Sequence, residues 1–189
     1  MIAAYVRGAR GRQMRPVLIP GNVVVAQLLA RSESQLPQAT VELCRSRAAL
    51  LGEPIAAAAL GWVATLLTAA LPERQPYPAV FAASAALLDA IEAAPSAKGW
   101  GAGLARVELL ILAQLGYGRE GGSIGAGDGD QSWAQVIAAL DRSGRLLERE
   151  ILADRPAVLL NSRGRLVDRL KRAAGDSLPA SPARPTSEA

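Results

Sequence analysis

The amino-acid sequence predicts an α+β fold that is mostly α, with about three strands of a small barrel followed by an all-α helical bundle domain. Alanine and leucine dominate from residue 48 onward, and aromatic residues make up only 4% of the chain, a composition that favours helix. Segments led by β-branched residues lie before residue 46. Half of the residues are apolar, so the chain can bury a core.

Three N-terminal segments are expected to be strands. Residues 2–7 contain Tyr5 and Val6, and residues 21–31 open with valines after a Pro-Gly-Asn turn. Residues 39–45 alternate between polar and apolar side chains, which is typical of a strand. Three strands are too few to close a barrel.

Five helices are expected over residues 54–71, 78–93, 98–115, 132–152 and 156–174, with a link or short helix at 48–51. Pro54 suits the first turn of the first helix, and Ser132 is a candidate N-cap. Residues 55–71 carry no charge over 17 positions, but they are mostly alanine between two prolines, so we interpret them as a buried bundle helix. The expected domains are 1–47 and 48–175, with a glycine-rich loop at 116–131 and a disordered tail at 176–189.

The positive charge of the chain is concentrated near its N-terminus. The net charge is +4 overall, and residues 1–47 carry seven basic against two acidic side chains, a net +5. The rest of the chain nearly balances. The N-terminal quarter is therefore the candidate for a polyanionic partner.

Four arginines without an intervening acid mark a basic loop over residues 7–22, between the first two expected strands. Arginine presents a fork of donors that matches phosphate oxygens, so nucleic-acid binding is one interpretation and a solvated charged loop is the other. Only Tyr5 is near enough to stack on a base, which argues against a platform of aromatic rings. The nucleic-acid-binding candidates from these residues are Arg7, Arg10, Arg12 and Arg15.

Three weaker candidates follow. A basic face on the last helix is either a plain solvated surface or a secondary nucleic-acid contact, and comprises Arg163, Arg165, Arg169, Lys171 and Arg172. The stretch 121–130 lacks the lysine of a phosphate loop and the ligands of a calcium loop, so it is interpreted as a linker. Cys44 is expected to be a small core residue.

The chain contains one cysteine and no histidine, which excludes a disulfide framework, a Cys/His zinc site and catalysis by a histidine base. No group of residues suggests an enzyme, a metal or a cofactor. No N-terminal targeting signal is visible, so a cytoplasmic location is expected.

The order of several motifs resembles the RecO family of bacterial recombination mediators. The motifs are R-P-V-L-I-P-G-N, V-E-L-C-R-S-R-A-A-L-L, A-L-P-E-R-Q-P-Y-P, A-L-L-D-A-I-E, R-V-E-L-L-I-L-A-Q-L-G-Y-G and R-L-V-D-R-L-K-R, and they span most of residues 1–175. The resemblance implies an N-terminal OB-fold with a helical domain, binding of single- and double-stranded DNA, strand annealing and support of RecA loading. It also implies RecR and single-strand-binding protein as partners, association with the nucleoid, and Arg31 as a further DNA contact.

Two departures from the family qualify these expectations. The family's OB-fold has strands ahead of the one at Ile2, so the fold expected here is an N-terminally incomplete OB-fold. The glycine-rich stretch stands where relatives carry zinc cysteines, so no zinc is expected. The alternative function is a protein–protein interaction module that docks RecR or single-strand-binding protein, with DNA binding impaired by the missing strands.

Overall fold

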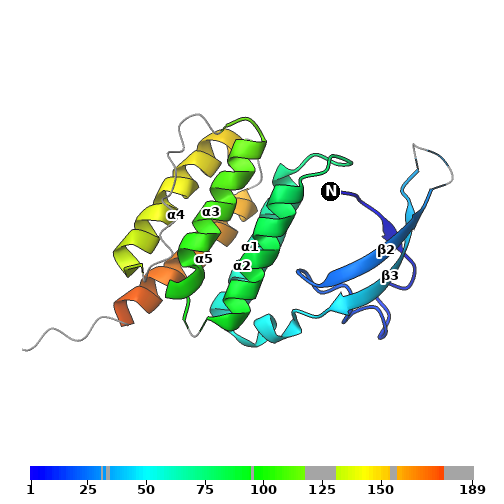
Figure 1. Cartoon of the computed structure of the whole chain (residues 1–189), viewed down its shortest axis with the longest axis horizontal. Coiled ribbons are helices and arrows are strands. Elements are labelled where there is room, and N and C mark those ends of the chain that lie inside the picture. Colours follow the sequence, from blue (N-terminus) through cyan, green and yellow to red (C-terminus); the bar gives the residue numbers. More distant parts are fainter. Residues whose placement is uncertain (31, 33–34, 95, 118–130, 154–156, 177–189) are drawn as a thin grey trace, which may run out of the picture.

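The computed structural model of the chain describes residues 1–30, 32, 35–94, 96–117, 131–153 and 157–176. Within them, a three-stranded sheet precedes five α-helices, which confirms the predicted α+β, mostly α fold (Figure 1). The glycine-rich stretch 118–130, the tail 177–189 and Arg31, about which the sequence made predictions, lie outside the described residues.

The sheet has the strand order β1-β3-β2. Strand β1 (Tyr5–Val6) runs parallel to β3 (Gln38–Arg45), and β2 (Val23–Leu29) runs antiparallel to β3. The first strand is shorter than predicted, because it pairs with β3 only at Tyr5–Gln38 and Val6–Ala39 and β3 begins at Gln38. The chain turns after it at Gly8, whose φ of 71° lies in the left-handed region.

The register between β2 and β3 separates two faces of the sheet. Val24 lies opposite Leu43, Ala26 opposite Val41 and Leu28 opposite Ala39, so one face carries apolar side chains only. The alternate pairs Gln27–Thr40 and Val25–Glu42 give the other face a mixed character. This alternation is what residues 39–45 predicted.

The helices begin and end close to their predicted limits. Pro54 and Pro78 occupy first turns, where the missing proline N–H costs no helical hydrogen bond. Ser132 and Gln135 form a reciprocal capping box, and a left-handed Gly116 follows the third helix. The helical elements are η1 (Ala48–Gly52), α1 (Pro54–Ala70), α2 (Pro78–Ala93), α3 (Lys98–Gln114), α4 (Trp133–Leu147), the π-helical turn η2 (Glu148–Leu152) and α5 (Ala157–Asp176).

A polar network lies inside the helical bundle. Glu108 of α3 is fully buried and accepts hydrogen bonds from Trp62 Nε1 at 2.7 Å, Ser143 Oγ and the Arg163 guanidinium. Arg163 also donates to the Leu140 carbonyl oxygen at 2.7 Å. Because the Glu108 carboxylate is both paired and hydrogen-bonded, its charge is tolerated in the core. The network joins α1, α3, α4 and α5.

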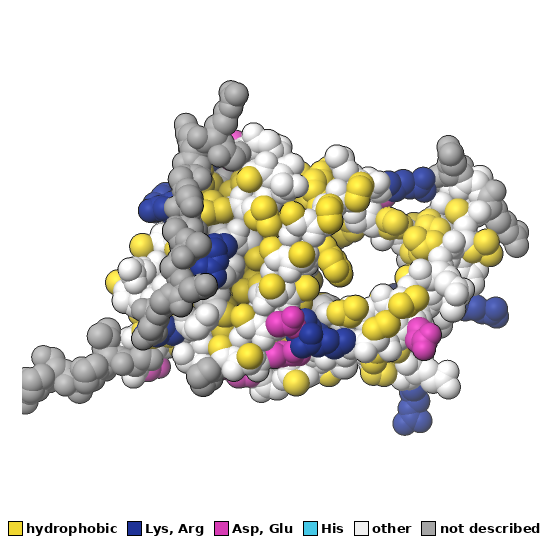
Figure 2. Space-filling view, viewed as in Figure 1, with side chains coloured by type: hydrophobic (Ala, Val, Ile, Leu, Met, Phe, Trp, Pro, Cys, Tyr) yellow, Lys and Arg dark blue, Asp and Glu magenta, His cyan; other side chains and the backbone are white. Residues whose placement is uncertain are grey.

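The sheet meets the bundle at both ends of a hollow that the space-filling view shows between them (Figure 2). At one end, the N-terminal Met1 accepts a hydrogen bond from Arg74 N at 2.6 Å and donates to the Gln75 carbonyl oxygen at 3.2 Å. At the other end, arginines from the end of β3 and the residues after it pair with carboxylates of α2. The sheet is therefore held at two separate places. None of the described helices is long and apolar enough to cross a membrane.

Candidate nucleic-acid interface

The basic loop (residues 7–22) is a series of tight turns between β1 and β2. The amide of Gly11 donates to the Gly8 carbonyl oxygen at 2.7 Å, and those of Arg15 and Leu18 donate four residues back at 3.1 and 3.0 Å. The loop is thus organised by its own backbone rather than extended into solvent. Such turns fix the backbone positions from which the arginine side chains project.

Asn22 closes the base of the loop. Its side-chain nitrogen donates to the carbonyl oxygens of Pro16 at 2.8 Å and Val17 at 3.0 Å, and its side-chain oxygen accepts from Arg47 N at 2.7 Å. Gly21, with φ at 84°, has no room for a side chain, because a Cβ there would overlap Leu60 of α1. The loop base is therefore fixed to the segment after β3 and packed on the bundle.

The four loop arginines are all exposed, as predicted. Among the described residues, none of their guanidinium groups forms an ion pair or a hydrogen bond. Figure 2 shows basic side chains projecting singly from the sheet end of the molecule rather than as one cluster. The loop can present separate cations to a chain of phosphates, and those cations have no carboxylate of the described residues to displace first.

Two further N-terminal arginines are already neutralised. Arg45 and Arg47 both pair with Asp89 at 2.6 Å and with Glu92 at 2.7 Å, forming a four-residue ion-pair cluster. A hydrogen bond from Arg47, together with the charges of Arg47 and Arg45, holds the pKa of Asp89 below its usual value of 3.8. The cluster attaches the sheet to α2, so these two arginines are structural and the loop keeps the unpaired positive charge.

The predicted basic face on α5 is not a single surface. Arg163 is 7% exposed and belongs to the Glu108 network, so its assignment to that face was wrong. Arg169 donates to the Pro54 carbonyl oxygen at 2.8 Å, and Lys171 pairs with Asp141 at 3.3 Å. Arg165 and Arg172 are exposed. A helical charge stripe does not reveal which of its members a neighbouring helix will cover.

Cys44 also differs from expectation, because it is exposed rather than buried. It lies near the end of β3 at an irregularity of the register, where Val23 pairs with Arg45 and Val24 with Leu43, so no residue of β2 lies opposite it. The residues that sequence reasoning missed are Asn22, Arg45 and Arg47. Their one signal was position: Asn22 ends the Pro-Gly-Asn turn, Arg45 ends the last strand, and Arg47 lies two residues further on.

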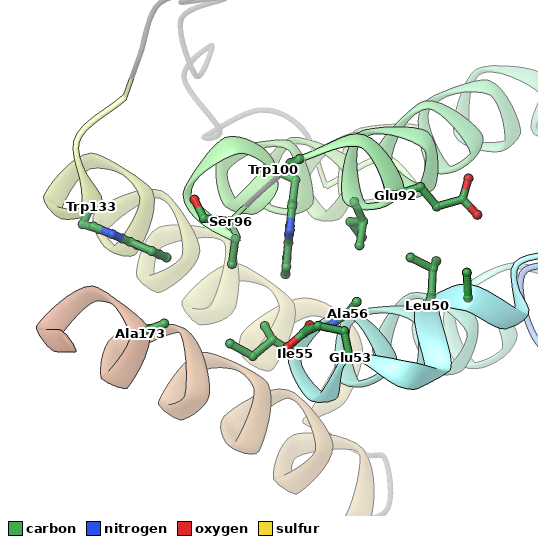
Figure 3. Close-up of a pocket in the computed structure, with 13 residues that line it drawn as sticks. Leu50, Glu53, Ile55, Ala56, Glu92, Ser96, Trp100, Trp133 and Ala173 are labelled. Carbon is green, nitrogen blue, oxygen red and sulfur yellow. The ribbon is translucent and has the colours of Figure 1, made fainter. Parts of the chain in front are cut away.

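A cavity of about 590 Å³ lies at one end of the bundle, where the starts of α1, α3 and α4 meet the ends of α2 and α5 (Figure 3). Trp100 points into it from α3, and Leu50 and Ala56 face it from the other side (Figure 3). Trp133 closes one end. The size and the mostly apolar lining are typical of sites that take up an apolar group of a ligand or partner.

Comparison with known proteins relates this architecture to DNA recombination. Residues 51–120 match the family model described as "Recombination protein O C terminal". The DNA repair protein RecO of Rhodospirillum centenum is 33% identical to this chain, in an alignment that covers 90% of this chain and 83% of that protein. DNA repair protein RecO of Caulobacter vibrioides strain NA1000 / CB15N is 32% identical, with coverage of 88% and 70%. That of Paracoccus denitrificans is 39% identical, with coverage of 62% and 48%. No solved structure matches.

The match of residues 51–120 to a recombination-protein domain, together with the similarity to these relatives, identifies the class as DNA repair proteins. The similarity also extends over the sheet, because the aligned region with the Rhodospirillum centenum protein covers 90% of the chain. The chain belongs to the RecO family.

Proposed function

We propose that the chain binds the phosphate backbone of single- and double-stranded DNA through Arg7, Arg10, Arg12 and Arg15, and acts without a catalytic step. The observation that carries the proposal is that these four guanidinium groups are exposed and unpaired within the described part of the chain. Their loop is fixed at its base by Asn22. A cation on a backbone that is already ordered loses less freedom when it binds a phosphate than one on an unstructured segment.

The same loop contains few groups that could read a base. Tyr5, at 56% exposed, is the aromatic residue next to it, and one ring makes a poor stacking platform. Recognition through charge alone is insensitive to sequence and works on single strands and duplexes. This tolerance suits a recombination mediator of the cytoplasm and nucleoid that anneals complementary strands and supports RecA loading, the role we propose.

The test is DNA binding as a function of salt, followed by fluorescence anisotropy of labelled single-stranded and duplex oligonucleotides. If all four arginines contact phosphates, log K falls against log salt with a slope of about −3 for single strands and about −3.5 for duplex. Changing the four together to alanine should remove most of the affinity and flatten the slope. Changing the four to lysine keeps the charge and should keep most of the slope.

A second variant controls for the loss of positive charge as such. Arg165, Lys171 and Arg172 of α5 lie on the bundle, away from the loop, and their change to alanine should leave DNA affinity near the wild-type value. A four-alanine loop variant that retains wild-type affinity at low salt would overturn the assignment of the site. Equal losses in the loop and α5 variants would show a diffuse effect of net charge instead.

A second candidate function is favoured by the cavity beside Trp100 and Trp133. In this case the chain is an interaction module whose bundle docks RecR or single-strand-binding protein, with DNA binding impaired. Ala173 lines the cavity from α5, so Ala173→Trp should fill it. Calorimetric titration with each purified partner distinguishes the candidates: an interaction module loses partner binding in this variant, and the wild type shows no salt-dependent DNA binding.

A further inference from the structure

The cavity at the end of the bundle has an apolar interior and a mouth open to solvent. Trp100 points into it and is 4% exposed, whereas Glu53 on the opposite wall is an exposed residue. Figure 3 shows Trp133 at one end and Glu92 at the other, with Trp100 and Glu53 between them. The volume of about 590 Å³ is in the range of sites that enclose a drug-sized ligand. The cavity therefore has room for an apolar side chain in its interior and for a polar group at its mouth.

The charged groups that line the cavity are acidic. Among the described lining residues, Glu53 and Glu92 carry a charge, and both are carboxylates. The charge of Glu92 is offset by the ion-pair cluster, in which Arg45 and Arg47 balance Glu92 and Asp89. The negative charge that remains at the cavity is therefore that of Glu53.

The Glu53 carboxylate can accept a further cation. Its Oε2 accepts a hydrogen bond from Ala56 N at 2.6 Å and so caps α1. Within the described part of the chain, Glu53 forms no ion pair. Arg169 donates to the carbonyl oxygen of the next residue, Pro54, but it does not line the cavity. A carboxylate offers about four lone-pair sites, so the N-cap hydrogen bond leaves Glu53 able to bind a cation from a partner.

We propose that the cavity docks a segment of a partner protein that combines an apolar side chain with a lysine or arginine. The apolar side chain packs against Trp100, and the cation lies at the mouth beside Glu53. The indole rings of Trp100 and Trp133 attract a cation that comes within about 6 Å of them, through their negative faces. An acidic segment would bring like charges together at the mouth, and this disfavours its binding.

The inference rests on the docking step of the second candidate function, and it goes beyond that function by giving the chemistry of the docked segment. It holds whether or not the basic loop binds DNA, so its test needs no DNA. Three acetylated and amidated peptides serve as probes. Each contains a pair of leucines, flanked by a pair of arginines, glutamines or glutamates, and each is titrated into the full chain labelled with ¹⁵N.

The indole N–H signals of the tryptophans give the readout. Those of Trp100 and Trp133 report on the cavity, and that of Trp62, which is bound to Glu108 in the core, reports on the fold. The arginine peptide should shift the two cavity signals and leave the Trp62 signal unchanged. It should bind about fivefold more tightly than the glutamine peptide, and the glutamate peptide should bind most weakly.

Three variants assign the preference to Glu53. Glu53→Gln removes the charge but keeps an oxygen for the Ala56 N–H, so it should remove most of the preference for the arginine peptide. Glu42→Gln removes an exposed carboxylate of β3, away from the cavity, and should leave the preference unchanged. Ala173→Trp fills the cavity and should abolish the binding of all three peptides.

Failure of the proposal is distinct from failure of the second candidate function. A wild type that binds no peptide, or that binds the glutamate peptide as tightly as the arginine peptide, overturns the proposal. So does a preference that survives Glu53→Gln, or one that Glu42→Gln removes equally. If RecR or single-strand-binding protein binds the wild type and not Ala173→Trp, while the glutamate peptide is preferred, the charge assigned here is wrong and the second candidate function stands.

Discussion

Replacing Gly144 with alanine is expected to destabilise the protein, although alanine is the better helix former. Gly144 lies in α4 against the guanidinium of Arg163, and an added Cβ would overlap Nη1 and lie 2.8 Å from Cζ. That guanidinium donates to both carboxylate oxygens of Glu108, at 2.9 and 2.8 Å. The alanine methyl group can be accommodated only if Arg163 moves away from Glu108.

The expected magnitude follows from the burial of Glu108, which is 0% exposed. Separating a buried ion pair costs about 3–5 kcal/mol, and alanine in place of glycine in a helix recovers about 1 kcal/mol. The free energy of unfolding should therefore fall by about 2–4 kcal/mol. Trp62 and Ser143 still donate to Glu108 after the change, which favours the lower part of that range.

Urea unfolding followed by tryptophan fluorescence measures this directly, since Trp62 lies in the same network. Gly164→Ala in α5 is the matched control, because a Cβ there has nothing within 4 Å. It should raise stability by about 0.5–1 kcal/mol through helix propensity alone. A Gly144→Ala variant as stable as the wild type would refute the reasoning, as would an equal loss in Gly164→Ala.

Three further predictions concern the basic loop, the attachment of the sheet to α2, and strand β3. Asn22→Ala removes three hydrogen bonds worth about 1 kcal/mol each, so loop amides should exchange hydrogen faster and DNA affinity should fall. Because the pKa of Asp89 is lower in the folded protein than its usual value of 3.8, the ionised carboxylate stabilises the fold at pH values above 3.8. This stabilisation is lost as the pH falls through the lower folded-state pKa. Asp89→Asn should therefore flatten the acid side of a stability–pH profile. Cys44 is exposed and should react with Ellman's reagent in the native protein about as fast as in urea.

The helices were predictable because their limits are set locally. Pro54 and Pro78 fix helix starts through their own rings, and Ser132 caps α4 through a residue three positions on. The strands were predictable from β-branched runs and alternation, although Gly8 ends the first strand earlier than composition suggests.

The candidate site was predictable only in part. The four loop arginines could be chosen as candidates from the local sequence, because their selection depends on no contact with a distant residue. The roles of Arg47 and Arg163 depend on Glu92 and Glu108, which lie 45 and 55 residues away along the chain. The apolar period of the third helix places position 108 on its inner face, yet it does not show which cation from another helix will reach it. Cys44 was predicted to be a core residue because a lone thiol in a strand is usually buried, and the local sequence does not show the register irregularity at which it lies.

The side chain of Asn22 connects the basic loop mechanically to the helical bundle. It binds the main chain at Pro16 and Val17 and the backbone N–H of Arg47, whose guanidinium is bound to Glu92 of α2. Tension applied to the arginines by a bound polymer therefore passes through side chains into α2 as well as along the backbone into β1 and β2. The sheet therefore shares that pull with the bundle, whose core is much larger.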